Sequence, residues 1–443
     1  MIVLRYDRGG IVARGGSIPH GKYDARKGVY RAPAFRYGEI VEHLEQQGVE
    51  YRDEALDLLP CPALSSDVEL RDYQRKALDA WMEAGRRGVI VLPTGAGKTF
   101  VALKAVEELQ EATLVVVPTL VLVDQWRRRL EEAFGTEIGV VGGGMNVLRG
   151  LTVATYASAS LRADQFGNRF GLLVLDEVHH LPAPRYRNIG LMYLAPYRLG
   201  LTATLEREDG GHVALLDLVG GRVYEREVDD LAGVHLSDYT VETVSVPLPE
   251  EEKAEYDSQY AIYRDFIRSR RIRMRSARDF QRFVMRSGRD PKARRAFLAR
   301  NRAMDIALNS SAKVGHLKRL LLKNPEEKAI IFTRHNSLVY RISREMLIPA
   351  ITHQTPAEER REILQGFRQG QYMRIVTSRV LDEGVDVPDA SLAVILSGTG
   401  SSREFIQRLG RVLRKKEGKR ARLVELVSRG TAETRMSRRR KAS

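Results

Sequence analysis

Short, continuous apolar runs recur along the chain, and residues that favour turns or loops bound each of them. These runs occupy 89–93, 113–118, 172–177, 329–333, 374–378 and 392–397. Amphipathic stretches of helical length lie between several of them, such as VALKAVEELQEA at 101–112 and VLVDQWRRRLEEAFG at 121–135. Strands that are apolar on both faces and alternate with helices are typical of parallel sheets covered on both sides. The pattern therefore predicts an α/β fold.

The alternation of strands and helices occurs twice, and the composition changes between the two occurrences. This predicts two α/β domains with a helical hairpin inserted in the second, because the inserted segment has little strand pattern and few glycines. The hairpin is expected to turn near Gly288 and Pro291. The predicted parts are a small mixed N-terminal domain at 1–65, the α/β domains at 66–235 and 236–430, the helical insertion at 250–305, and a basic tail at 431–443.

The composition places the chain among ordinary globular proteins. Of its 443 residues, 43% are apolar and 29% are charged. No apolar run approaches the roughly 20 residues that are needed to span a bilayer, so we expect no membrane partner. The only cysteine, Cys61, cannot form an internal disulfide, which favours a reducing cytoplasm.

The formal net charge of +15 is concentrated in two segments. Residues 264–302 hold fifteen Lys or Arg against three acidic residues, and 435–441 hold five against none, which leaves the remaining chain close to neutral. The run RSRRIRMR at 268–275 places five arginines in eight positions. A solvated helix face is the ordinary explanation of one charged cluster, but such faces normally mix signs. The local imbalance favours a surface that binds a polyanion.

A candidate phosphate-binding loop, LPTGAGKT at 92–99, follows the apolar run at 89–93. Glycines let the backbone close around a phosphate, and the helix that follows directs its positive end to the same anion. In this arrangement Lys98 would reach the terminal phosphates and Thr99 would offer its hydroxyl to Mg²⁺. The strict pattern begins with glycine, whereas position 92 is leucine. Taken alone, this loop therefore leaves open the alternative that the match is a coincidence. The predicted loop residues are Thr94, Gly95, Ala96, Gly97, Lys98 and Thr99.

Two carboxylates, Asp176 and Glu177, stand where the apolar run at 172–177 ends. Ligands of parallel sheets bind at the carboxyl ends of the strands. There, one carboxylate can hold Mg²⁺ and the next can orient and deprotonate an attacking water. A solvated strand end is the usual alternative for such a pair, but the upstream GKT loop favours a catalytic role. The adjacent histidines, His179 and His180, are expected on an extended segment facing opposite sides, which argues against a zinc site.

The second α/β domain carries QRLGRVLR at 407–414, with Arg411 and Arg414 three residues apart on one expected helix face. Phosphoryl transfer needs positive charge opposite the charge that develops on the γ-phosphate. Arginines from a second domain supply it only when the domains close. The residues therefore predict a site shared by two domains.

In chain order, nine blocks between residues 66 and 430 resemble the motif series of superfamily 2 helicases. They are LRDYQ, LPTGAGKT, VPTLVLVDQW, VATY, DEVHH, GLTAT, IIFT, VTSRVLDEGVDVP and QRLGRVLR. The resemblance implies two RecA-like motor domains that use ATP and Mg²⁺, with Thr99 and Asp176 at the metal and Lys98, Asp176 and Glu177 as catalytic residues. It further implies adenine recognition by Arg71 and Gln74, coupling by Thr202 and Thr204, nucleotide sensing by Gly384 and Asp386, and an arginine-finger motif of Gln407, Arg411 and Arg414.

More narrowly, the chain is similar to archaeal XPB-type helicases. The segment EREDG after GLTATL matches the Arg-Glu-Asp element that this family uses to separate strands, here Arg207, Glu208 and Asp209. The family also carries a basic thumb near the start of the second motor domain and a small N-terminal domain implicated in recognising distorted DNA. The resemblance thus implies phosphate contacts from the thumb arginines Arg268, Arg270, Arg271, Arg273 and Arg275.

The expected activity is therefore ATP-dependent opening of DNA, with the 3′ to 5′ polarity that the family implies, in repair or transcription. Forked, partly single-stranded or distorted DNA is the expected substrate, and the family suggests a nuclease as partner. Three alternatives stay open: a translocase on double-stranded DNA that does not unwind processively, an RNA-unwinding enzyme, and an inactive DNA-binding scaffold. The intact set of motor residues argues against the scaffold.

Overall fold

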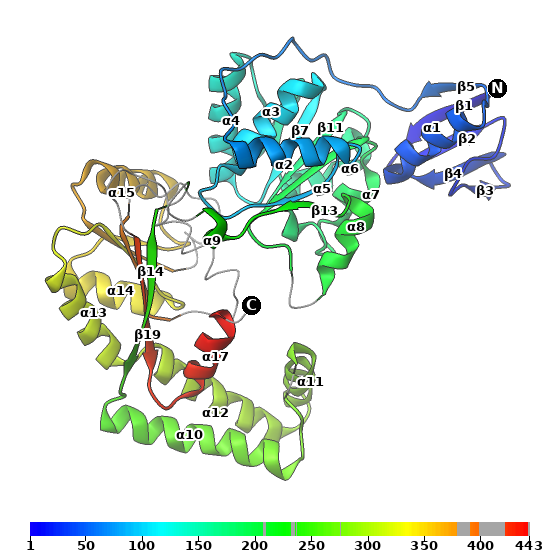
Figure 1. The fold of residues 1–443 in the computed structure, drawn as a ribbon. Coiled ribbons are helices and arrows are strands. Elements are labelled where there is room, and N and C mark those ends of the chain that lie inside the picture. The colour runs from blue at the N-terminus through cyan, green and yellow to red at the C-terminus, as the bar shows by residue number, and fades with distance from the viewer. Residues whose placement is uncertain are drawn as a thin grey trace. The chain divides into compact units, whose positions relative to one another are not determined.

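The computed structural model of this chain describes residues 1–206, 210–231, 235, 237–274, 276–378, 390–397 and 421–441. The chain forms two compact units, Met1–Glu227 and Val228–Ser443, and each contains a parallel sheet flanked by helices (Figure 1). Together with a small mixed N-terminal sheet and a helical insertion, this arrangement confirms the predicted α/β fold class.

The N-terminal domain is a small sheet with one helix across its face (Figure 1). The strand order is β3-β4-β2-β1-β5, in which β1 pairs antiparallel with β2 and parallel with β5. Alternate residues of β1 and β2 point inward and pack against Ile40 and Leu44 of the helix. The elements are β1 (Ile2–Asp7), β2 (Gly10–Arg14), β3 (Lys22–Asp24), β4 (Val29–Pro33), η1 (Ala34–Arg36), α1 (Tyr37–Gln46) and β5 (Tyr51–Glu54).

The N-terminal domain packs directly on the first α/β domain. Its core includes Leu194 of that domain, and the Tyr6 hydroxyl lies 2.7 Å from the carbonyl oxygen of Ala163 and 3.0 Å from that of Met192. The segment around Met192 and Leu194 is also held from inside by Arg198, which is fully buried and donates to the carbonyl oxygens of Gly190, Tyr193, Ala195 and Leu218. Burial holds the pKa of Arg198 well below its ordinary value.

The sheet of the first α/β domain has the order β13-β6-β12-β11-β7-β10-β8-β9 and is parallel except for the β8–β9 pair. Its strands are β6 (Arg87–Val91), β7 (Thr113–Val117), β8 (Gly139–Gly142), β9 (Met145–Val147), β10 (Leu151–Thr155), β11 (Leu172–Asp176), β12 (Tyr197–Thr202) and β13 (Arg222–Glu225). The apolar runs at 89–93, 113–118 and 172–177 form the strands β6, β7 and β11, as predicted, and each of them has a neighbouring strand on both sides.

Helices cover both faces of this sheet, because each parallel connection must cross from one strand end to the other. The predicted amphipathic segments at 101–112 and 121–135 form most of α3 and α4. The helical elements are α2 (Asp72–Glu83), α3 (Lys98–Leu109), α4 (Leu120–Phe134), α5 (Tyr156–Leu161), α6 (Ala163–Phe166), η2 (Val178–His180), α7 (Arg187–Met192), η3 (Gly211–Val213) and α8 (Ala214–Leu218).

The second unit contains a parallel sheet that, among the described residues, has the order β14-β19-β18-β15-β17-β16. Its strands are β14 (Tyr239–Val246), β15 (Ala329–Phe332), β16 (Ala350–Ile351), β17 (Arg374–Thr377), β18 (Leu392–Ile395) and β19 (Ala421–Ser428). The helices outside the insertion are α9 (Val228–Leu231), α13 (Ser311–Lys323), α14 (Asn336–Met346), α15 (Ala357–Gln369) and α17 (Ala432–Lys441). The predicted basic tail at 431–443 thus contains a helix.

The basic insertion, called the thumb here, consists of the helices α10 (Glu250–Ser269), α11 (Ala277–Ser287) and α12 (Pro291–Leu308). The sequence predicted one turn, near Gly288 and Pro291, and this turn is present between α11 and α12. A second break separates α10 from α11, where Arg271 has a left-handed φ of 49° and Ser276 caps α11 through the Asp279 amide. Among the helices that the structure describes, none is long and apolar enough to cross a membrane.

Candidate nucleotide-binding site

The 92–97 loop leaves β6 and leads into α3, which begins at Lys98. Gly97 has a left-handed φ of 77°, and a Cβ atom there would lie only 2.4 Å from the Gln74 side-chain nitrogen. The Lys98 ammonium donates to the Leu92 carbonyl oxygen at 3.0 Å, so it folds back over the loop. Thr94 Oγ1 is buried and has no hydrogen-bond partner in the described part of the chain. The loop therefore presents an unused hydroxyl donor next to a lysine ammonium, a combination that suits an anion site.

The start of α2 closes one side of this loop. The buried Gln74 side chain accepts from the Arg71 amide at 2.9 Å and donates to the Ala96 carbonyl oxygen at 2.9 Å. The Tyr73 hydroxyl donates to the same carbonyl oxygen at 2.7 Å, and burial raises the pKa of this hydroxyl. A pocket of about 410 Å³ opens here, lined by Asp67, Val68, Glu69, Arg71, Gln74, Gly95, Ala96, Gly97 and Phe100. Its size and its exposed aromatic ring, Phe100, suit a planar base.

Asp176 and Glu177 lie at the carboxyl end of the central strand β11, and each is only 9% exposed. Asp176 accepts from the Trp126 indole at 2.9 Å through one oxygen and from the Glu177 amide at 3.0 Å through the other. Glu177 adopts φ 50° and ψ 52°, a left-handed conformation that is strained for a residue with a side chain. The strain turns the chain sharply after the strand and fixes two consecutive carboxylates at the sheet edge.

Two side chains of α4 contact the two predicted metal ligands. Trp126 holds Asp176, and Arg129, one turn further along, donates to the Thr99 hydroxyl at 2.8 Å. Because residues three apart share a helix face, Thr99 and Asp176 face the same side of α4. A hydroxyl and a carboxylate that share one face are oxygen ligands of the kind that Mg²⁺ prefers. The residues present therefore fit a Mg²⁺ ion, with Arg129 standing at one of its ligands.

His179 joins the carboxylate pair to the neighbouring strand β12. Its Nδ1 atom lies 3.4 Å from a Glu177 carboxylate oxygen and 3.1 Å from the Thr202 hydroxyl. Thr202 donates its own proton to the Thr204 carbonyl oxygen at 2.7 Å, so Nδ1–H must be the donor to Thr202. The histidines lie in the 3₁₀ turn η2 with ring centroids 4.4 Å apart, so the predicted extended segment with opposed faces was wrong.

The structure brings together the predicted residues of the first α/β domain at one sheet edge. Strands β6, β12 and β11 are adjacent, and their carboxyl ends lead to the 92–99 loop, to Thr202 and to the carboxylate pair. Several predicted residues lie outside the described residues: Arg207, Glu208, Asp209, Arg275, Gly384, Asp386, Gln407, Arg411 and Arg414.

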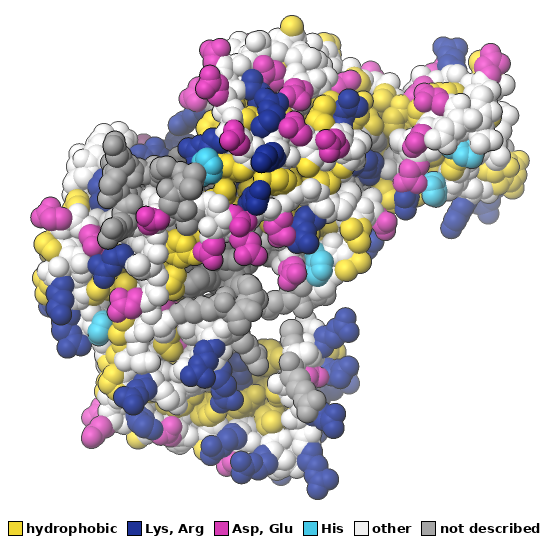
Figure 2. All heavy atoms as spheres, viewed as in Figure 1, with side chains coloured by type: hydrophobic (Ala, Val, Ile, Leu, Met, Phe, Trp, Pro, Cys, Tyr) yellow, Lys and Arg dark blue, Asp and Glu magenta, His cyan; other side chains and the backbone are white. Residues whose placement is uncertain are grey.

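The basic run of the thumb lies at the end of α10 and in the loop that follows. Arg268, Arg270, Arg271 and Arg273 are all exposed. Figure 2 shows Lys and Arg side chains gathered over the thumb helices, with few acidic side chains among them. The side chains are thus accessible for phosphate contacts.

Sequence reasoning missed Trp126, Arg129 and His179. The signal was present in the motif blocks VPTLVLVDQW and DEVHH, but a tryptophan on an amphipathic helix is usually packing and an arginine beside it is usually solvated. Only the fold shows that this face of α4 points to the carboxyl edge of β11.

Comparisons with known proteins agree on the class of this chain. Residues 67–207 match the family described as Type III restriction enzyme, res subunit, and residues 312–416 match the Helicase conserved C-terminal domain. Residues 4–55 match the Xeroderma pigmentosum group B helicase damage recognition domain. The solved helicase domain of Hef from Pyrococcus furiosus has a similar fold, with a TM-score of 0.53 at 19% identity, and the likeness covers 83% of this chain and 97% of that one.

Relatives of similar sequence include archaeal and eukaryotic proteins. The chain is 45% identical to the "DNA 3'-5' translocase XPB2" of Sulfurisphaera tokodaii over the full length of both. It is 33% identical to the "Putative DNA 3'-5' helicase Rad25" of Haloarcula marismortui, covering 89% of this chain and 58% of that protein. With the "General transcription and DNA repair factor IIH helicase/translocase subunit XPB/SSL2" of Saccharomyces cerevisiae, the identity is 29% over 89% of this chain and 45% of the yeast protein.

Proposed function

The chain belongs to the XPB family of superfamily 2 helicases, and from this membership we propose that it opens DNA with 3′ to 5′ polarity in repair or transcription, using Mg²⁺ and ATP. The observation that carries the proposal is the shared sheet edge of the first α/β domain. There the 92–99 loop, the Asp176–Glu177 pair and Thr202 follow three adjacent strands. The groups proposed for phosphate binding, water activation and coupling thus lie at the same edge of the sheet.

In the proposed mechanism, the loop amides and Lys98 hold the terminal phosphates of ATP. Thr99 and Asp176 would hold Mg²⁺, which supplies charge neutralisation of the phosphates when it is bound. The Glu177 carboxylate orients the attacking water and accepts its proton. The pocket beside Gln74 takes the adenine base.

The second α/β domain would complete the reaction. Gln407, Arg411 and Arg414 would bring positive charge to the γ-phosphate on closure, while Gly384 and Asp386 would sense the nucleotide. His179 lies between the Glu177 carboxylate and the Thr202 hydroxyl, to which it donates. A shift of the carboxylate during hydrolysis would therefore move Thr202 and Thr204. These two residues would transmit the movement to the DNA-binding surface. Closure and reopening would then advance the strand.

DNA would be held by the thumb, and the Arg207, Glu208 and Asp209 element would separate its strands. Phosphate contacts carry no sequence information, so the thumb arginines suit a motor that works on any sequence. The N-terminal domain would bind distorted DNA, in line with the family whose damage recognition domain it matches. Forked or partly single-stranded DNA and a nuclease partner remain the proposed substrate and partner, at the nucleoid in the cytoplasm.

The proposal is tested by measuring ATP turnover and displacement of a labelled strand from forked DNA. Glu177→Gln should abolish both activities and keep ATP binding, because the amide cannot accept the proton from water. Glu83→Gln, at an exposed position in α2, is the matched control and should behave as the unaltered protein. Undiminished turnover by Glu177→Gln would contradict the role assigned to this carboxylate.

A translocase on double-stranded DNA is the second candidate, because a relative that aligns over its full length is named a DNA 3'-5' translocase. Both candidates use the same ATP site, so the ATPase assay does not distinguish them. Displacement of a third strand from a triplex without displacement of the fork strand would favour the translocase. Stimulation of ATP turnover by RNA instead of DNA would contradict both.

A further inference from the structure

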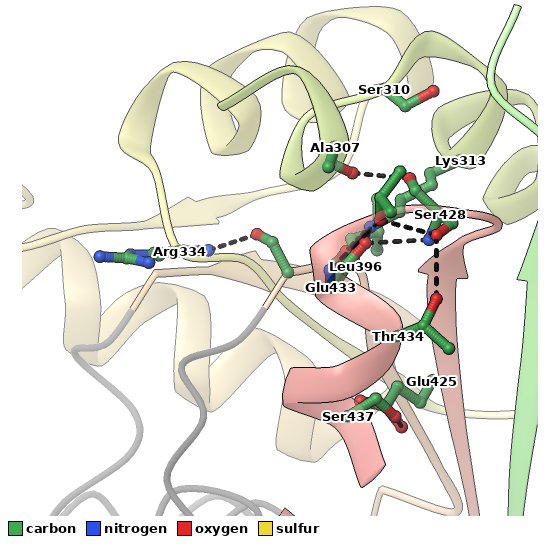
Figure 3. A network of polar contacts seen from close by, with 12 residues as sticks. Ala307, Ser310, Lys313, Arg334, Leu396, Glu425, Ser428, Glu433, Thr434 and Ser437 are labelled. Carbon is green, nitrogen blue, oxygen red and sulfur yellow. Dashed lines mark hydrogen bonds and ion pairs between the residues drawn. The ribbon is translucent and has the colours of Figure 1, made fainter. Parts of the chain in front are cut away.

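The C-terminal helix α17 is fastened to the second α/β domain by a buried polar network (Figure 3). The Lys313 ammonium donates to both carboxylate oxygens of Glu433, at 2.7 and 2.6 Å, and to the Leu396 carbonyl oxygen at 2.9 Å. Glu433 also accepts from the Ser428 amide at 2.9 Å. Lys313 and Glu433 are each about 1% exposed. All three ammonium protons of Lys313 are thus used, and the Lys313–Glu433 pair holds α17 at the carboxyl edge of the sheet.

The network leaves α17 with two faces of different character. Glu433 and Ser437, four residues apart, point inward, where the Ser437 hydroxyl donates to Glu425 at 2.6 Å. Arg435 and Arg438, three residues apart, are exposed. No ion pair of either arginine is found among the described residues. The acidic residue of α17, Glu433, is therefore paired inside the domain, and the exposed charges of Arg435 and Arg438 are both positive.

The thumb helices α10 and α12 both contact α17. The Ala432 amide at the start of α17 donates to the Tyr256 hydroxyl of α10 at 2.8 Å, and α12 packs against α17. Since Arg435 is three residues after Ala432, it lies on the side of α17 that faces α10. In α12, the Arg300 guanidinium lies 4.5 Å from the Phe280 ring centre and 5.9 Å from that of Tyr263.

The tyrosine rings of α10 lead from the α17 contact at Tyr256 towards Arg300: ring centres lie 5.4 Å apart for Tyr256 and Tyr260, and 5.7 Å apart for Tyr260 and Tyr263. Burial raises the pKa of the Tyr263 hydroxyl, and the charges of Arg300 and Arg435 both oppose that rise. Arg435 acts in the same direction on Tyr256, whose pKa burial raises to about 12. Two guanidinium groups from segments far apart in the sequence therefore act on one phenol.

We propose that Arg435 and Arg438 of α17, together with Arg300 of α12 and the Tyr263 hydroxyl, form a binding site for the phosphate backbone of a nucleic acid strand. A guanidinium pairs with phosphate oxygens through two parallel hydrogen bonds, and a phenol adds a neutral donor. The inference rests on the proposed function, because it supplies the DNA motor with a second grip besides the exposed run at 268–275. Unlike that run, the α17 part of this site is held at the sheet of its own domain by the Lys313–Glu433 pair.

The test is the salt dependence of binding to a labelled oligothymidylate and to a blunt DNA duplex. The variant carries Arg435→Gln and Arg438→Gln. The matched control carries Lys323→Gln and Arg344→Gln, exposed cations in the last turns of α13 and α14, which precede β15 and β16 at the amino edge of the sheet. Each lost phosphate contact reduces the slope of log K against log salt by about 0.7 to 0.9, so the variant should lose up to about 1.4 to 1.8.

The control should keep the slope of the unaltered protein, because its charges are removed far from the proposed site. An Arg435→Lys, Arg438→Lys variant should also keep it, because both positive charges remain on α17. Equal thermal unfolding and equal ATP turnover without DNA show that the variants are folded. A slope unchanged by the glutamine substitutions, with DNA still stimulating ATP turnover, overturns this site and leaves the proposed function standing. Absence of DNA binding by the unaltered protein would instead contradict the function. Polyglutamate, an anion without phosphate, is tested as a third probe. If the glutamine variant binds polyglutamate less well than the unaltered protein but binds DNA equally well, the assignment of the site to nucleic acid is overturned.

Discussion

At the scale of single residues, helix α4 controls both oxygen ligands of the candidate metal site. Trp126 fixes the Asp176 carboxylate, and Arg129 donates to the Thr99 hydroxyl. The two contacts have opposite consequences for a cation. The indole orients its carboxylate without adding charge, whereas the guanidinium is itself a cation and must leave Thr99 before Mg²⁺ binds there.

Arg129→Ala is therefore expected to lower the Mg²⁺ concentration that gives half-maximal ATP turnover. A hydrogen bond from a charged donor contributes roughly 1.5 kcal/mol, so the shift should be up to about tenfold. The measurement is ATP turnover across a series of free Mg²⁺ concentrations at saturating ATP. Arg128→Ala, an exposed neighbour on α4, is the control and should cause no shift. A higher Mg²⁺ requirement would mean that Arg129 assists the ion or the phosphates.

His179→Ala should weaken the link between hydrolysis and strand opening. The imidazole donates to Thr202 beside the Glu177 carboxylate, and neither contact holds the phosphates. ATP turnover should then fall by about fivefold, the effect of one lost hydrogen bond of ~1 kcal/mol, while strand displacement per ATP falls further. His180→Ala serves as the control. Equal loss of both activities would show that the histidine acts on the chemistry alone.

The residues whose positions could be predicted are those that come at or after the end of a strand. Lys98, Thr99, Asp176 and Glu177 follow apolar runs directly, so the strand end determines where they lie. His179 and the α4 side chains depend on how a turn and a helix pack on that edge. This packing has no local signature in the sequence.

At the scale of elements, α17 is held by an ion pair with almost no access to water. Glu433→Gln would leave the Lys313 ammonium buried without its counter-charge, which costs about 3–5 kcal/mol of unfolding free energy. This loss of unfolding free energy is measured by urea unfolding of the full chain, monitored with a spectroscopic signal that reports on the second unit. Replacing both partners, with Lys313→Met and Glu433→Leu, should restore much of the loss, because no charge remains buried. An equally large loss in the double variant would show that shape, not charge, matters here.

The strands that were predicted have unbroken apolar runs, whereas β14 and β19 lack them. Most residues of β14 are exposed or half-exposed, and β19 contains the buried Glu425, which accepts from Ser437 of α17. A charged residue in a strand looks like a surface position until its partner helix is known. For the same reason, the break after α10 was missed: arginines dominate it, and its cap at Ser276 uses an ordinary serine.

At the scale of the whole molecule, the N-terminal domain is joined to the first α/β domain through Tyr6. Burial raises the pKa of this hydroxyl to about 12. A pKa that is higher in the folded state than the ordinary value near 10 gives stability that is complete below about pH 10. This contribution is lost as the pH rises from about 10 through about 12.

Tyr6→Phe should therefore lower the unfolding free energy of the first unit at neutral pH by ~1 kcal/mol and lessen its fall above about pH 10. Urea unfolding at a series of pH values, with the two proteins compared at each, measures both effects. Tyr23→Phe removes an exposed hydroxyl from the same domain and should leave the curve unchanged. Identical pH profiles for the protein and Tyr6→Phe would show that the joint does not depend on this hydroxyl.

The ammonium of Lys313 grips the carbonyl of Leu396, two residues before the 398–420 segment that carries Arg411 and Arg414. A DNA strand under tension on α17 would transmit force to that carbonyl through Glu433 and Lys313. Turnover of ATP should then respond to mechanical tension, and stretching a single tethered DNA molecule while the motor runs would reveal whether it stalls, slows or speeds up under load.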